Sequence, residues 1–256
     1  LGGVLGTLPT TIVTASVGFA AVASHAALAD SLATVPVGMV LNAGFLYLWR
    51  VVPPHLPDTS LPVRLALMTV VSLVGWLLGA LCVVYSEDAL ASVGVSVAWQ
   101  GSTAAVVLVV LGLLACRNLP PAPRGRRRVG VATLVARGLL SAGAIGAALG
   151  LSQVAGPMAA GLASVFPAIF LTAMASLWLS QGEAVPLGAV GPMILGSSAV
   201  VVYALVAAVS IPALGTAPGA TLAWVIAVMG ISVPAAALLA RKRDDAAPTV
   251  PPTPAP

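Results

Sequence analysis

The chain has 256 residues, of which 59% are hydrophobic and 7% are charged, and its formal net charge is +4. Ordinary soluble proteins are about 25% charged, so this composition excludes a water-soluble fold of the same size. The mean hydropathy of +1.08 predicts an integral membrane protein that crosses the bilayer many times.

Long stretches without Asp, Glu, Lys or Arg define the expected spans. A helix needs about 20 apolar residues to cross the hydrocarbon core. Inside lipid, the backbone polar groups must be bonded within their own segment. The sequence therefore predicts an all-α fold, a polytopic transmembrane helix bundle of about eight spans. In chain order, these spans are 4–28, 33–52, 62–86, 92–116, 131–151, 157–181, 187–211 and 219–240.

Charged residues and Pro- and Gly-rich segments mark the expected connections between the spans. Asp30 is expected in the loop after the first span, and Glu87 and Asp88 are expected in the loop after the third. The segments 152–157 and 212–218 divide the two longest apolar stretches, because Pro and Gly at this density are typical of turns.

Basic residues gather around the connections after the second, fourth and eighth spans, whereas the connections after spans one, three, five and seven hold no basic residue. By the positive-inside rule, the even-numbered connections and the C-terminus are expected in the cytoplasm. No aromatic residue interleaves with the basic run of the fourth connection, which favours anionic lipid headgroups over nucleic acid as its partner. This run consists of Arg124, Arg126, Arg127 and Arg128.

Two pairs of similar segments predict an internal repeat. LPTTIVTA at 8–15 matches FPAIFLTA at 166–173, and MVLNAG at 39–44 matches MILGSS at 193–198. The first two spans would then correspond to the sixth and seventh, which cross the membrane in the opposite direction. Such inverted repeats are typical of secondary transporters. The alternative is coincidence, because a chain rich in Ala, Val and Gly produces such matches readily.

The expected domain organisation is a single integral membrane domain over 1–240. Its repeat halves would be 1–116 and 131–240, joined by the basic loop 117–130, and a counterpart of the fifth span is expected before the first residue. The remaining residues, 241–256, are basic at first and then Pro-rich, which predicts a disordered tail.

Several polar residues and two prolines lie within predicted spans. A proline in a helix interior leaves a carbonyl of the preceding turn without its helical bond, and in lipid this carbonyl needs another partner. The alternatives are a kinked helix whose hydroxyls bond to their own turn, or, for Pro9, a first-turn proline. Asn42, in mid-span, needs a partner on another helix or on a solute. The candidate substrate path comprises Pro9, Thr10, Thr11, Thr14, Asn42, Ser164, Pro167, Thr172, Ser197 and Ser198.

The fifth span carries small residues at every fourth position, which predicts close helix packing. These residues are Gly138, Ala142, Gly146 and Gly150. No acidic residue is expected at mid-membrane, and no motif of a hydrolase, a nucleotide-binding protein or a metal site is present. The sequence therefore predicts no enzyme activity, no metal and no cofactor.

The preferred function is a secondary-type carrier of a small neutral or anionic solute that works by alternating access. The alternatives are a non-transporting membrane scaffold or assembly subunit and, with least support, a membrane-embedded lipid-modifying enzyme. A carrier predicts that Pro9, Thr14, Asn42, Pro167 and Thr172 converge on one polar cavity, whereas a scaffold predicts separate, satisfied packing sites.

Overall fold

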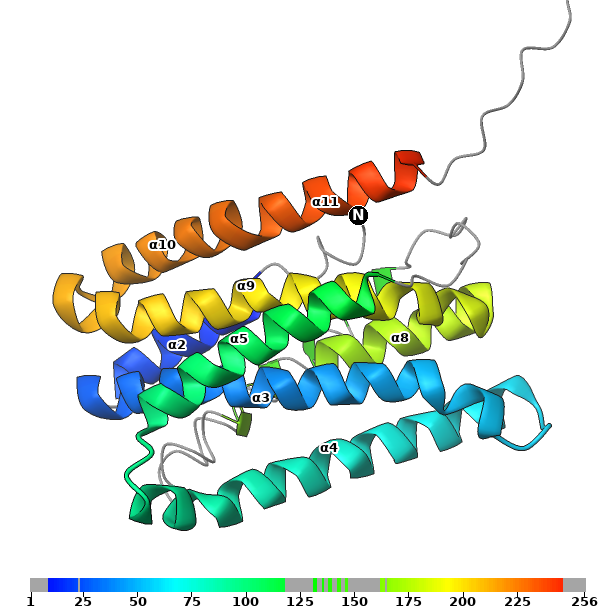
Figure 1. The fold of residues 1–256 in the computed structure, drawn as a ribbon, viewed down its shortest axis with the longest axis horizontal. Coiled ribbons are helices and arrows are strands. Elements are labelled where there is room, and N and C mark those ends of the chain that lie inside the picture. The colour runs from blue at the N-terminus through cyan, green and yellow to red at the C-terminus, as the bar shows by residue number, and fades with distance from the viewer. Residues whose placement is uncertain are drawn as a thin grey trace, which may run out of the picture.

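A computed structural model describes three continuous segments of the chain, together with isolated helical positions between residues 131 and 163. The continuous segments are 9–22, 24–117 and 165–245. Within them every long element is a helix, and the helices run side by side (Figure 1). Five are long and apolar enough to cross a membrane, which supports the predicted membrane bundle. They cover Ala27–Val51, Leu61–Ser86, Ala98–Ala115, Ala184–Leu214 and Thr216–Lys242.

The count of eight spans is not confirmed. The five long apolar helices correspond to the second, third, fourth, seventh and eighth expected spans. The first and sixth spans are represented by shorter helices, α2 (Thr10–Val22, 13 residues) and α8 (Ala168–Gln181, 14 residues). Most of the fifth span, together with the division at 152–157, lies outside the described residues.

Two helices, α3 (His25–Val51) and α9 (Ala184–Leu214), form the centre of the bundle and pack against each other. Helix α5 (Val97–Ala115) crosses both of them, while α4 (Leu61–Ser92) lies on the outside against α3 (Figure 1). The apolar windows of α3 and α9 are 61% and 67% buried, whereas those of α4 and α5 are each 22% buried. The outer helices therefore present most of their apolar surface to the surroundings.

Glycines allow α5 to approach both central helices at backbone distance. A Cβ atom at Gly101 would collide with the carbonyl oxygen of Ala33 in α3. Eleven positions later, a Cβ at Gly112 would lie 2.8 Å from the Cα atom of Leu195 in α9. Since Leu108 between these contacts is fully buried, the face of α5 that carries the two glycines is its packing face.

The first turn lies earlier than the sequence predicts. The side chain of Ser24 accepts a hydrogen bond from the backbone N–H of Ala27 at 3.2 Å and thereby caps the start of α3. Asp30 is consequently a helical residue, and its expected place in a loop is wrong. The first N–H groups of a helix have no partner within the helix, and a capping side chain supplies one. The start of α3 is therefore marked by the Ser24 cap and not by the charged residue Asp30.

The turn after α4 lies later than expected, for the same reason. Helix α4 continues to Ser92, so the expected loop position of Glu87 and Asp88 is wrong. The chain reverses at Gly94, with φ of 80°, and the side chain of Ser96 caps α5 by accepting the N–H of Trp99 at 3.3 Å. A left-handed glycine followed by a serine cap supplies the turn.

The division between the last two spans falls at Gly215, with φ of 88°, inside the expected segment 212–218. The rest of that segment is helical, with Pro212 inside α9, so the turn is shorter than predicted. Helix α10 (Thr216–Ala227) folds back onto α9, continues through a π-helical turn at Val228–Ser232 and becomes α11 (Val233–Asp245). The widened turn ends two residues before Pro234, which has no N–H to continue the α-helical pattern. The first five residues of the expected tail are thus helical, and the rest lie outside the described residues.

The turns between helices form two groups at opposite ends of the bundle (Figure 1). The α2–α3, α4–α5 and α9–α10 turns lie at one end. The α3–α4 connection, the α8–α9 turn and the C-terminal parts of α5 and α11 lie toward the other, which we call the basic end. It carries Arg50, Arg64, Arg117, Arg241 and Lys242.

Candidate functional site

The chain breaks its helical path immediately before α8. The N–H of Val165 donates to the carbonyl of Leu162 at 3.1 Å, and Pro167 then precedes the first residue of α8 with φ of −75° and ψ of 31°. Proline has no N–H and obstructs a helix that arrives from the preceding turn, so the chain turns here before it resumes as α8. Pro167 therefore lies at a break in the helical path.

Asn42 of α3 contacts this break directly. Its side chain is 1% exposed, and Nδ2 donates to the carbonyl oxygen of Val165 at 2.8 Å. Gly38, one turn earlier, makes the approach feasible, because a Cβ there would collide with the Val165 side chain. A carbonyl oxygen can only accept, so the amide group of Asn42 must point its Nδ2 at Val165. Its other atom, Oδ1, is buried and has no hydrogen-bond partner among the described residues. We call Gly38, Asn42, Val165 and Pro167 the break site.

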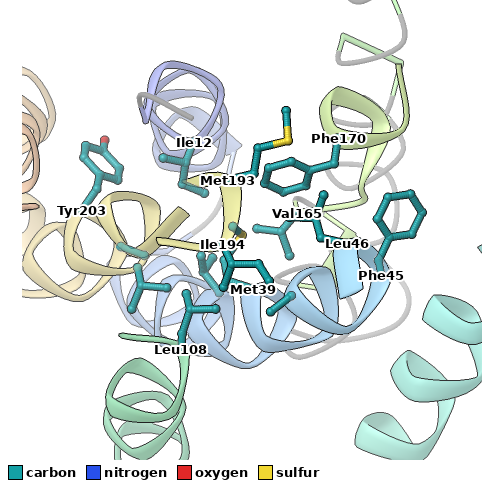
Figure 2. Close-up of a cluster of buried hydrophobic side chains, with 14 of the residues drawn as sticks. Ile12, Met39, Phe45, Leu46, Leu108, Val165, Phe170, Met193, Ile194 and Tyr203 are labelled. Carbon is teal, nitrogen blue, oxygen red and sulfur yellow. The ribbon is translucent and has the colours of Figure 1, made fainter. Parts of the chain in front are cut away.

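The break site lies within the main buried core. Figure 2 shows Val165 between side chains of α3 and α9, with Met39 on one side and Met193 on the other, and with Ile12 of α2 and Phe170 of α8 nearby. Asn42 also lies 3.5 Å from the sulfur of Met39. A single polar contact is thus surrounded by apolar and sulfur-containing side chains.

The predicted hydroxyl residues do not join Asn42. Thr14 donates to the carbonyl of Thr10 at 3.3 Å, Thr172 to that of Ala168 at 2.8 Å, and Ser197 to that of Ile194 at 2.7 Å, all within their own helices. This is the alternative that the sequence left open. Of the predicted path, the described residues thus bring together Asn42 and the break at Pro167.

The other members of the predicted path lie apart. Pro9 is buried and directly precedes α2, while Thr10 is exposed. Ser198 is buried on α9, and its hydroxyl has no partner among the described residues. The side chain of Thr11 and the whole of Ser164 lie outside the described residues.

The two segments of the expected repeat have the same local plan. Each consists of a short helix directly preceded by a proline, a tight turn and a long helix: α2 and α3 have 13 and 27 residues, and α8 and α9 have 14 and 31. The two hairpins turn at opposite ends of the bundle (Figure 1). The two hairpins also touch each other, because Asn42 of the α2–α3 hairpin bonds to the helix break that precedes the α8–α9 hairpin.

Sequence reasoning missed two polar contacts between distant segments. The hydroxyls of Ser16 in α2 and Tyr203 in α9 lie 2.6 Å apart in the core. A tyrosine far from both ends of a span was the available signal, because its hydroxyl needs a partner inside lipid.

The second missed contact is an ion pair at the basic end. Arg64 of α4 donates from Nη2 to Glu183 Oε1 at 2.7 Å and from Nε to Oε2 at 3.1 Å. The same guanidinium donates to the carbonyls of Pro53, Leu56 and Pro57 at 2.9, 3.2 and 2.9 Å. One side chain thus joins the start of α4, the α3–α4 connection and the α8–α9 turn. Glu183, an isolated acid near the sixth connection, was the signal.

Two further cations converge on the end of α5. Arg50 donates to the carbonyl of Ala115 at 3.3 Å, and Lys242 donates to that of Cys116 at 3.1 Å. Burial raises the pKa of the Cys116 thiol, and the positive charges of Lys242 and Arg50 partly oppose this shift. The predicted headgroup residues Arg124, Arg126, Arg127 and Arg128 lie outside the described residues.

The predicted packing stripe stays a prediction. Gly138, Ala142 and Gly146 are helical and exposed, and a Cβ at Gly138 or Gly146 would meet no described atom within 4 Å. Gly150 lies outside the described residues. Among the described residues, no group of three His, Cys, Asp or Glu side chains is placed to hold a metal ion.

Comparison with protein-family models, with curated proteins and with solved structures found no match for this chain. The break site is therefore interpreted by its own geometry and by its position in the bundle.

Proposed function

We propose that this chain is a secondary-type carrier and that the break site binds its solute. One observation carries the proposal: a buried amide, Asn42, bonds a carbonyl at a helix break in the bundle core, while its own Oδ1 has no partner among the described residues. A buried acceptor without a partner is costly, and a donor on a bound solute would satisfy it. Interrupted helices at the membrane midplane are typical solute sites in carriers.

The chemistry of the break site favours one kind of solute. Two oxygens of the break site, Asn42 Oδ1 and the Val165 carbonyl, are acceptors, and none of its four residues is charged. Acceptors attract N–H and O–H groups and repel anions. Of the neutral and anionic solutes that the sequence allows, we therefore favour a small neutral molecule with hydroxyl or amide donors.

Alternating access would arise from the two hairpins. The α2–α3 and α8–α9 pairs turn at opposite ends, as the halves of an inverted repeat do, and they meet at the break site. Relative movement of these pairs would expose the break site first to one end and then to the other. The ion pair between Arg64 and Glu183 would hold the basic end closed in the described conformation.

The basic end would face the cytoplasm, following the positive-inside rule. Exposed Asp58 lies in the α3–α4 connection at this end, and exposed Val93 lies in the α4–α5 turn at the other. In a chain without Cys82 and Cys116, Asp58→Cys should react with a membrane-impermeant maleimide in inside-out vesicles only, and Val93→Cys in right-side-out vesicles only. The reverse pattern would overturn the orientation.

Accessibility of the core tests the carrier. In the same cysteine-free chain, Ser198→Cys on α9 should react slowly with the impermeant reagent from either side, because each state opens the core to one end. Ser72→Cys is the matched control, since Ser72 is equally buried but lies on the outer helix α4. It should stay unlabelled. Absence of labelling at Ser198→Cys from both sides, with Asp58→Cys labelled normally, would exclude alternating access.

A scaffold or assembly subunit is the second candidate. It is favoured by the hydroxyls of Thr14, Thr172 and Ser197, which are satisfied within their own helices and leave few donors for a solute. Under this function Asn42 only joins α3 to the break before α8. The labelling experiment separates the two candidates, because a scaffold has no state in which the core meets water.

A further inference from the structure

A groove of about 510 Å³ runs along the outer surface between α3, α5 and α9. On α3 its lining residues lie between Ala43 and Arg50, so it is about 10 Å long at 1.5 Å per residue. Leu111 and Leu114 of α5 form its apolar wall and are 39% and 53% exposed. Gly44 leaves it open, because a Cβ there would meet nothing within 4 Å.

The groove ends at positive charge. Arg50 lines it and is held at the end of α5 by its bond to the Ala115 carbonyl. Lys242 reaches the next carbonyl, that of Cys116, from α11. Two cations from different helices therefore meet at one helix end, and none of the described lining residues is acidic. Carbonyl oxygens at this helix end carry only partial negative charge.

We propose that this groove binds an anionic phospholipid, with the phosphate at Arg50 and Lys242 and an acyl chain against Leu111 and Leu114. Arg50 is the second-last residue of its apolar span, which is the depth of the headgroup region. From there the groove follows α3 inward for about 10 Å, within the depth of about 15 Å that one leaflet of the hydrocarbon core supplies. A soluble phosphate would bind Arg50 and Lys242 but would make no contact with Leu111 and Leu114. The proposal is independent of solute transport.

The experiment compares lipids added to the full chain in detergent. Native mass spectrometry counts bound lipid, and thermal unfolding reports its stabilising effect. Phosphatidylglycerol should bind and raise the melting temperature, whereas phosphatidylcholine with the same acyl chains and free glycerol phosphate should not. Arg50→Gln should weaken phosphatidylglycerol binding by about tenfold, the expected loss for one charge-assisted hydrogen bond. Arg241→Gln is the matched control, because Arg241 is exposed near the same end but does not line the groove.

Gly44→Leu tests the acyl chain separately. It fills the groove and leaves both cations in place, so it should reduce phosphatidylglycerol binding without lowering the stability of the lipid-free protein. Three results would overturn the proposal: equal binding of the two lipids, equal effects of Arg50→Gln and Arg241→Gln, or a Gly44→Leu variant that is unstable without lipid. The last result would mean that another part of the protein occupies the groove. Stabilisation by glycerol phosphate alone would assign the cations to a soluble anion instead.

Discussion

Helices α9 and α4 are almost equal in length and hydropathy but occupy opposite positions in the bundle. They have 31 and 32 residues, and the mean hydropathy of their apolar segments is 2.3 and 2.4. Yet the α9 segment is 67% buried and the α4 segment 22%. Hydropathy therefore identifies both as spans and does not distinguish the central helix from the outer one.

Side-chain size distinguishes them. The buried face of α9 contains many small residues, which let neighbouring backbones approach closely. These include Gly191, Gly196, Ser197, Ala199, Ala204 and Ala207. The exposed face of α4 consists of large aliphatic residues, including Val70, Val74, Leu77, Leu78 and Leu81. In lipid, where apolar burial between helices gives little driving force, close packing of small residues decides which helix becomes central.

Polar contacts differ in the same way. Tyr203 of α9 bonds to α2, and Ser210 of α9 donates to the carbonyl of Gly219 in α10 at 2.9 Å. On α4, Ser72 and Ser86 donate only to carbonyls of their own helix, at 2.8 and 2.9 Å. Tyr203 and Ser210 of the central helix thus bond to other helices, although Ser197 bonds within α9, whereas Ser72 and Ser86 of the outer helix bond within α4.

The largest effect is expected where α5 touches α9 by its backbone. Gly112→Leu should lower the free energy of unfolding by about 3 kcal/mol, because a Cβ there meets backbone atoms of Leu195 that cannot move aside. Gly75→Leu on α4 is the matched control. Its Cβ would lie 3.0 Å from Leu48 Cδ1, the flexible end of a side chain, and should cost less than about 1 kcal/mol. Unfolding in mixed micelles measures both, and equal losses would break the distinction between central and outer helices.

Arg64 is the exception on α4, and its removal should have the next largest effect. Arg64→Lys should lower the melting temperature more than Glu183→Gln, because lysine cannot reproduce a forked pair together with bonds to three backbone carbonyls. Glu183→Gln keeps those three carbonyl bonds. Thermal unfolding of the two variants at low and high salt is the measurement. If Glu183→Gln lowers the melting temperature more than Arg64→Lys does, α4 is held to the bundle mainly by the ion pair and the carbonyl bonds contribute less.

The sequence predicted what depends on local composition. Apolar length located five long helices, and the cost of an amide in lipid indicated that Asn42 has a partner. That partner, the Val165 carbonyl, lies 123 residues away and depends on a helix break, so no local pattern could name it. The contacts of Tyr203 with Ser16 and of Arg64 with Glu183 likewise join residues that are 187 and 119 positions apart in the sequence.

Turn positions and packing were less predictable, for different reasons. Acidic residues predict loops at Asp30 and Glu87, but Ser24 and Ser96 cap the helices, and hydropathy does not detect a cap. Small-residue packing was expected from spacing every fourth residue. The close contacts of α5 are eleven residues apart, at Gly101 and Gly112, because this helix crosses two different partners. A single-partner pattern cannot describe such a helix.

Asn42 tests whether the interhelical bonds of the central helices stabilise the fold. Asn42→Leu removes the donor and leaves the Val165 carbonyl buried, so it should cost about 1.5 kcal/mol. Ser72→Ala on α4 removes a bond within one helix and should be close to neutral. Unfolding in mixed micelles measures both variants. A loss at Ser72 as large as that at Asn42 would show that local and interhelical bonds are equivalent in this protein.

The smallest effect is expected for the coupling between Ser16 and Tyr203. A double-mutant cycle with Ser16→Ala and Tyr203→Phe should give a coupling energy of about 0.6 kcal/mol, typical of neutral interhelical hydrogen bonds in membranes. The value is small because the unfolded helices also find polar partners in the bilayer. A coupling near zero would mean that α2 is held by apolar packing alone. A coupling well above this value would place α2 with α3 and α9 in the central group, since the bond between Ser16 and Tyr203 would then contribute as much as the bond of Asn42.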